Sequence, residues 1–149
     1  MFRGTFFHAL DEKARVAIPR KFREALIGSQ GDTRVVITKS ATRGARALDI
    51  YPIAEWQNLE ARIRERPQFQ SNIQQFKRKY IAPAQDLALD AQGRIVVPAN
   101  LREWIDLGKE AVFTGDLEKF LLWSKNEYER VADDDGAGDD ELSFEDLQI

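Results

Sequence analysis

The sequence predicts an α+β fold in which two β half-barrels form an internal pseudo-dimer, with a helical hairpin between them. The first observation is a repeat, because LDEKARVAIPRKFREAL at residues 10–26 returns as LDAQGRIVVPANLREWI at residues 89–105. The second is that each copy contains short apolar segments rich in β-branched residues, as strands do. The third is the polar segment between the copies, residues 55–80, whose apolar residues recur at helical spacing.

Each copy of the motif is expected to form a strand, a tight turn, a second strand and a short helix. Residues 16–18 and 95–97 have the composition of strands, and Pro19 and Pro98 suit the first turn of the helices that follow. A copy of about 45 residues is small for a core of its own. The two copies are therefore expected to bury their sheets against each other.

A pair of strands is expected to follow each short helix. Residues 35–38 pair with residues 48–51 in the first copy, and residues 111–114 with residues 120–123 in the second. Gly115 and Asp116 are expected at the turn of the second hairpin.

The segment between the copies is expected to be a helical hairpin divided at Pro67. A further helix is expected to begin at Ser124, since Glu127 follows at the spacing of a capping box. Past Ala132 the chain carries eight acids and no base. Because such a segment cannot bury enough apolar area, it is expected to be disordered. The apolar residues that define the two helices of the hairpin are Trp56, Leu59 and Ile63, then Phe69, Ile73, Phe76 and Tyr80.

These elements divide the chain into four parts. They are a first domain at residues 5–54, a helical connector at 55–80, a second domain at 81–125, and a C-terminal helix with an acidic disordered tail at 126–149.

The net charge of −3 conceals a strong asymmetry along the chain. Residues 1–79 carry 16 bases and 8 acids, whereas residues 80–131 carry 6 bases and 9 acids. One cationic surface contributed mainly by the first half fits a polyanionic partner, and a merely solvated charged surface is the alternative.

The Asp-x-x-x-Arg turns supply the candidate site residues. Asp11 and Asp90 are expected to accept backbone hydrogen bonds within their turns, and Gly93 to adopt a positive φ. Ala14 stands where the second copy has Gly93, so the first turn is either strained, by about 1 kcal/mol, or differently shaped. Alternation along the strands places Arg15 and Arg94 on the face away from the core, where a guanidinium can meet phosphate or guanine.

Cations gather around the first motif more than around the second. The first motif is therefore expected to be the better phosphate binder. Lys39, Arg43 and Arg46 could extend this surface or simply aid solubility. The candidate DNA-binding residues are Arg3, Lys13, Arg15, Arg20, Lys21 and Arg23 in the first copy and Arg94 in the second, with Arg102 nearby.

The sequence does not favour an enzyme. It has no cysteine, one histidine, no Gly-rich phosphate loop and no metal-ligand cluster, so no catalytic constellation, cofactor or small-molecule substrate is expected. His8 is expected to be structural. No apolar run is long enough for a membrane span, and the N-terminus does not have the pattern of a secretory signal.

Four features together resemble the MraZ family of bacterial transcriptional regulators. They are the opening MFRG, the paired L-D-x-x-[AG]-R-[VI]-x-[IV]-P motifs, the Tyr-Pro of DIYPIAEW, and G-x-x-x-K-F-x-L-W at residues 115–123. The resemblance covers residues 1–131, so it does not extend to the acidic tail. Ala14 and the long loop at residues 39–46 depart from the pattern.

The resemblance implies two SpoVT-AbrB-like domains that build a swapped-hairpin AbrB-type β-barrel, and a ring-shaped homo-oligomer. It implies a cytoplasmic, nucleoid-associated regulator, acting as a repressor, that binds short repeated promoter sites in double-stranded DNA upstream of the division and cell-wall gene cluster, its own gene included. Asp11 with Arg15, and Asp90 with Arg94, match the family motif. The alternative is an AbrB-like protein-interaction or antitoxin-type module.

Overall fold

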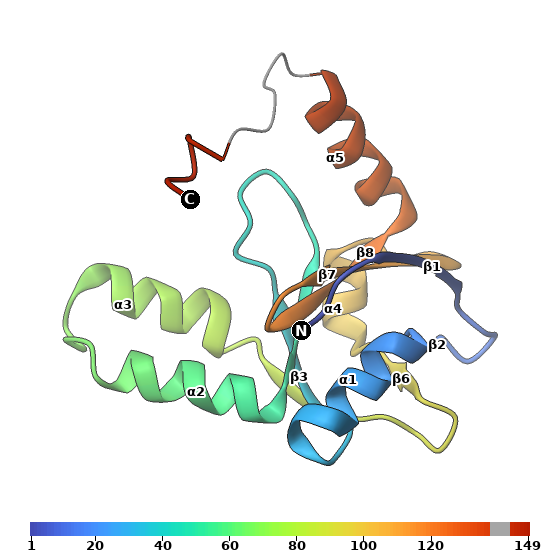
Figure 1. Cartoon of the computed structure of the whole chain (residues 1–149), viewed down its shortest axis with the longest axis horizontal. Coiled ribbons are helices and arrows are strands. Elements are labelled where there is room, and N and C mark those ends of the chain that lie inside the picture. Colours follow the sequence, from blue (N-terminus) through green and yellow to red (C-terminus); the bar gives the residue numbers. More distant parts are fainter. Residues whose placement is uncertain (138–143) are drawn as a thin grey trace.

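The computed structural model describes residues 1–137 and 144–149, and its elements follow the repeat (Figure 1). The first copy contains β1 (Thr5–Ala9), β2 (Arg15–Ala17), α1 (Arg20–Gln30), β3 (Arg34–Lys39) and β4 (Leu48–Pro52). The second contains β5 (Gln85–Ala88), β6 (Arg94–Val96), α4 (Ala99–Trp104), β7 (Glu110–Asp116) and β8 (Lys119–Ser124). This order confirms the α+β class and the predicted strand pairs.

The two copies exchange strands. The six-stranded antiparallel sheet has the order β1-β7-β8-β4-β3-β5, so β1 of the first copy pairs with β7 of the second. Likewise, β5 of the second copy pairs with β3 of the first. The remaining strands, β2 and β6, pair with each other as a separate two-stranded ribbon. Each copy therefore completes the sheet of the other.

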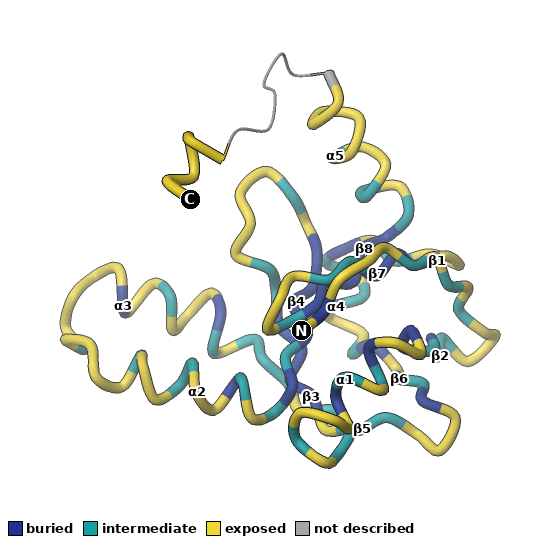
Figure 2. Tube along the Cα trace, viewed as in Figure 1, coloured by how far each residue is buried: buried dark blue, intermediate teal, exposed yellow. Residues whose placement is uncertain are grey.

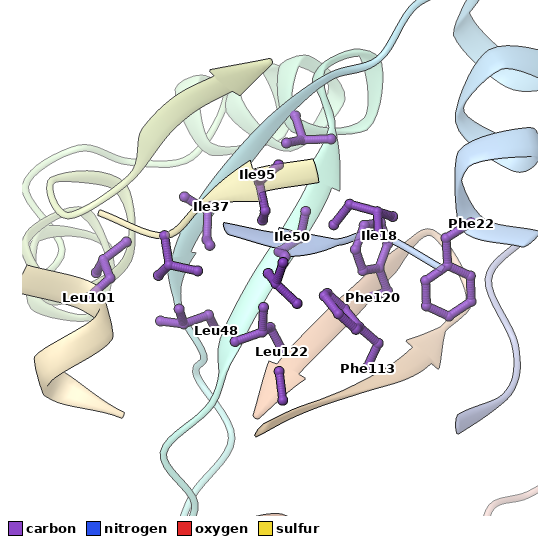
Figure 3. Packing of buried hydrophobic residues seen from close by; sticks show 14 of the residues in the cluster. Ile18, Phe22, Ile37, Leu48, Ile50, Ile95, Leu101, Phe113, Phe120 and Leu122 are labelled. Atoms are coloured by element: carbon purple, nitrogen blue, oxygen red, sulfur yellow. The ribbon is translucent and has the colours of Figure 1, made fainter. Parts of the chain in front are cut away.

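The main hydrophobic core lies between the sheet, the ribbon and the helices α1 and α4 (Figure 3). Matching positions of the two copies fill it, which is why neither copy needs a core of its own. The pairs are Val16 with Ile95, Ile18 with Val97, Phe22 with Leu101, and Leu26 with Ile105, all 3% exposed or less.

The helical hairpin forms a second, smaller cluster outside the sheet. It consists of α2 (Ile53–Arg64) and of α3 (Ser71–Phe76), which continues into a π-helical turn, η1 (Lys77–Ile81). Trp56 and Tyr80 pack on Val36 of β3, and their rings stack at 5.9 Å. The rest of the hairpin projects from the sheet and is largely exposed (Figure 2). The expectation for Phe69 was wrong, since α3 begins only at Ser71 and Phe69 is 94% exposed.

A buried polar cluster ties this hairpin to the sheet. The carboxylate of Asp49 on β4 is fully buried, accepts a hydrogen bond from the hydroxyl of Tyr80, and lies 3.3 Å from Nζ of Lys119 on β8. The hydroxyl of Tyr51 lies 2.6 Å from that of Tyr80. Burial, reinforced by the charge of Asp49, raises the pKa of Tyr80 far above its usual range. Burial alone would lower the pKa of Lys119, but Asp49, Tyr51 and Asp116 together outweigh it and raise that pKa.

The β7–β8 turn lies further along the chain than expected, and Gly115 is not one of its residues. Gly115 and Asp116 still belong to β7, pairing with Phe120 and Lys119, and Leu117 adopts the positive φ of the turn. A Cβ at Gly115 would lie 2.4 Å from the backbone nitrogen of Arg3. The glycine is therefore needed where the N-terminal segment crosses the hairpin.

The last helix, α5 (Lys125–Ala137), begins where the capping pattern predicted. Ser124 Oγ accepts a hydrogen bond from the N–H of Glu127 at 3.2 Å. The helix continues past Ala132, contrary to expectation, and an Arg130–Asp134 pair at 3.0 Å supports this extra turn. Part of the tail predicted to be disordered, residues 138–143, lies outside the described residues. In the described part of the chain, no helix has the length and apolar composition needed to span a membrane.

Candidate nucleic-acid interface

The ribbon of β2 and β6 brings the two Asp-x-x-x-Arg motifs together. Its register pairs Val16 with Ile95, both buried, and sets Arg15 opposite Val96 and Arg94 opposite Ala17. Strand alternation therefore turns both arginines away from the core, as expected. The two turns lie at the same end of the molecule (Figure 1). Residues from distant parts of the chain thus form one surface, called here the arginine ribbon: Asp11–Arg15 and Asp90–Arg94 with their strands.

The two turns have the same hydrogen bonds. Asp11 Oδ1 accepts the N–H groups of Lys13 and Arg15, both at 2.9 Å, and Asp90 Oδ1 accepts those of Gln92 and Arg94 at the same distance. These bonds hold the pKa of each carboxyl below its usual value, and the bond from the backbone N–H of the arginine has the largest effect. Desolvation acts in the opposite direction and raises the pKa. Both aspartates thus accept the backbone hydrogen bonds expected of them.

Ala14 and Gly93 both have positive φ, 58° and 76°. The question left by the sequence is thereby answered: the first turn has the same shape as the second, and Ala14 is held in a conformation that favours glycine. Gly93 has a further reason to be glycine. A Cβ there would lie 2.3 Å from Cδ of Arg23, whose side chain covers the turn.

The guanidinium groups of Arg15 and Arg94 differ in how many of their nitrogens have partners within the protein. Arg15 donates through Nε to Asp11 at 2.7 Å, and its terminal Nη groups have no hydrogen-bond partner in the described residues. Arg94 donates through Nε to Asp90 at 2.9 Å and through Nη2 to Gln92 at 3.3 Å, and its Nη1 lies 3.7 Å from Asp11. Arg15 therefore offers more free donors to a ligand.

The cations of α1 lie beside the turn of the other copy. Arg20 and Arg23 line a cavity of about 300 Å³ together with Asp90 and Gly93. Arg23 Nη1 donates to the carbonyl of Gln92 at 3.2 Å. The sequence assigned these residues to the first motif, and the structure places them beside the turn of the second. Lys13 and Lys21 are exposed, as a phosphate contact requires.

Arg3 and the long loop lie apart from the arginine ribbon. The N–H of Phe2 donates to Leu117 at 2.7 Å, which fixes Arg3 beside the β7–β8 turn, at the opposite end of β1 from Asp11. Lys39 and Arg46 lie over the ring of Trp104, at 5.1 and 5.5 Å. Lys39 is half-buried there, whereas Arg46 and Arg43 are exposed.

No catalytic arrangement accompanies this surface in the residues that the structure describes. His8 Nδ1 lies 2.6 Å from the carbonyl oxygen of Ala17, a contact within the fold that fits the structural role expected of it. No group of three or more metal-ligating side chains occurs in that part of the chain.

The depressed pKa values of Asp11 and Asp90 predict a dependence on pH. A carboxyl whose pKa is lowered on folding stabilises the fold above its ordinary pKa of about 4, and this contribution is lost as the pH falls through the folded value. The amide proton shifts of Arg15 and Arg94 should therefore change together on acidification, as measured by NMR.

Asp11→Asn is the matched control, because the amide keeps an acceptor oxygen but does not titrate. In this variant the shift at Arg15 should no longer depend on acid while that at Arg94 still does. If the amide shift of Arg15 still changed with the same pH midpoint in the variant, a group other than Asp11 would be responsible for the change.

Comparison with known proteins agrees with the geometry. The family described as "MraZ protein, putative antitoxin-like" matches residues 1–79 and again residues 80–145. A protein named "Transcriptional regulator MraZ" from Acidithiobacillus ferrooxidans is 40% identical over 124 residues, covering 83% of this chain and 82% of its own. Proteins of the same name from Pseudomonas aeruginosa (36% identity; 91% and 87% covered) and a Thermoanaerobacter species (34%; 100% of both) are also similar. That name describes a regulator and not an enzyme. The chain, with its two matched repeats, belongs to the MraZ family.

Proposed function

We propose that the protein is a transcriptional regulator that binds double-stranded DNA through the arginine ribbon. The observation that carries this proposal is the pairing of β2 with β6, which presents Arg15 and Arg94 on one outward surface. Arg15, held by Asp11 through Nε, keeps its planar Nη edge for a phosphate or a guanine, whereas the Nη groups of Arg94 are partly engaged by Gln92 and Asp11. Lys13, Arg20, Lys21 and Arg23 flank the ribbon as phosphate contacts, and Arg3 would meet DNA only at a distance from it.

The names of the relatives support the role of regulator, and the finer parts of this proposal rest on the resemblance of the motifs. The chain is composed of two SpoVT-AbrB-like domains, residues 5–54 and 81–125, built as swapped-hairpin AbrB-type half-barrels. Copies associate into a ring that sets several ribbons on one face. The ring represses the division and cell-wall gene cluster, its own gene included, and resides in the cytoplasm on the nucleoid.

An antitoxin-type protein-interaction module is the second candidate, because the matching family is described as "putative antitoxin-like". The two candidates differ in their response to salt. Binding through phosphate contacts weakens steeply as salt rises, whereas a mainly apolar protein interface does not. Footprinting of the purified protein on its own upstream region, at low and high salt, decides between them.

Binding is expected to depend steeply on the number of DNA repeats. A single ribbon offers few contacts, so several ribbons on one ring would gain affinity by acting together. DNA with three repeats, spaced near the helical period of about 10 bp, should bind at least roughly tenfold more tightly than DNA with one. Fluorescence anisotropy with one to four repeats, beside light scattering of the free protein, measures this. A compact monomer that binds one repeat as tightly as three would contradict the ring.

A further inference from the structure

A second cationic surface lies away from the arginine ribbon, between the loop of residues 40–46 and the helix α3–η1. A cavity of about 360 Å³ opens there, lined by Arg43 from the loop, by Asn72 and Gln75 from α3, and by Phe76 and Lys79. We propose that this cationic groove binds the acidic C-terminal segment of the same chain, residues 144–149. The proposal does not depend on DNA binding.

The charges of the groove and of the tail are complementary. Both walls come from stretches without a single acid, residues 33–48 and residues 66–85, which carry four bases each. Arg43 and Lys79 form no ion pair within the described part of the chain. The tail, residues 132–149, has eight acids and no base. A surface with this field attracts an anionic segment.

The tail also has large apolar side chains that are exposed to solvent. Phe144, Leu147 and Ile149 are 67%, 60% and 82% exposed, and Glu145 and Asp146 lie between the first two of them. The groove is also lined by the half-buried ring of Phe76. An acidic segment with an aromatic residue can therefore bury Phe144 against Phe76 while its carboxylates meet Arg43 and Lys79.

The helix α5 is anchored on one wall of the groove, which brings the tail within reach. Arg130 Nη2 donates to the carbonyl of Gly44 at 2.6 Å, and the N–H of Arg46 donates to Glu127 at 2.7 Å. From Arg130 to Ala137 the helix rises about 10 Å. The seven residues from 138 to 144 can span up to about 23 Å. That length exceeds the rise of the helix beyond Arg130, so the segment can return to the loop that forms one wall of the groove.

Photo-crosslinking of the full chain tests the proposal. Because the chain has no cysteine, Gln148→Cys creates a unique site for a benzophenone label. After illumination and digestion, the crosslinks are expected at residues 40–44 and 72–79 and should disappear in 1 M salt. Mixing with an isotopically labelled copy should show that tail and groove belong to one chain. Crosslinks to the arginine ribbon, or to the groove of another copy, would overturn the proposal.

Charge reversal provides the matched control. Arg43→Glu with Lys79→Glu should reduce groove crosslinking at least about fivefold, because two attractions become repulsions. Arg62→Glu with Arg64→Glu makes the same change in net charge on α2, outside the groove, and should leave crosslinking within about twofold. Equal losses in both pairs would show that only the overall charge matters, and would refute a specific groove.

Discussion

Replacement of Arg15 by alanine is expected to weaken binding to repeated DNA by roughly 1–3 kcal/mol per site, or about 5- to 150-fold, with folding intact. The side chain is about one-third exposed, and the only bond that it makes in the described residues is the Nε bond to Asp11. Its Nη edge is therefore free for a phosphate or a base. If that contact is to a phosphate, the slope of log affinity against log salt should fall by about one.

Arg94→Ala is expected to cost less, since the Nη groups of Arg94 already interact with Gln92 and Asp11. The sequence suggested the same ranking for another reason, a shortage of cations near Arg94, and that reason fails because Arg20 and Arg23 lie beside the second turn. Arg62→Ala, a loss of one exposed charge on α2, is the control and should change affinity little. Equal losses of DNA affinity in Arg15→Ala and Arg94→Ala would mean that the number of free Nη donors does not determine how much each arginine contributes to binding.

The local structure of this protein could be read from its sequence, because local rules decide it. Proline ends the strands before α1 and α4, the aspartates specify the two Asp-x-x-x-Arg turns, and Ser124 begins α5. The failure at Gly115 has a cause outside its own segment. Gly115 looked like a turn residue because nothing in its neighbourhood shows that the N-terminal segment crosses it.

The composition of the site could not be read in the same way. The positions of Arg15 and Arg94 follow from strand alternation, so they were predictable. Which cations accompany each arginine depends on the pairing of β1 with β7 and of β5 with β3, which joins segments far apart in the chain. The charge pattern along the chain is therefore a guide to the whole surface but not to either turn.

The buried polar cluster was missed for the same reason. Asp49, Tyr80 and Lys119 belong to three separate elements, and each is ordinary within its own segment. Only the packing of η1 and β8 around β4 reveals that the carboxylate is fully buried and paired. A buried charge of this kind is destabilising when its partner is lost, and less so when both charges are removed.

Lys119→Met is accordingly expected to destabilise the protein more than the double variant Asp49→Asn with Lys119→Met. The single change leaves a carboxylate buried without its ammonium partner. The expected cost is about 2–3 kcal/mol, below the usual range for buried pairs because Lys119 is 25% exposed.

For a domain of this size that cost lowers the melting temperature by roughly 5–10 °C, measured by circular dichroism at one fixed protein concentration. In the double variant, the amide introduced at position 49 can still accept a hydrogen bond from the hydroxyl of Tyr80 without carrying a charge, so part of the loss should be regained. The hairpin would then stay attached through this hydrogen bond and its stacked rings. Asp49→Asn alone completes the cycle, and strictly additive losses in this variant, Lys119→Met and the double variant would show that Asp49 and Lys119 do not act as a pair.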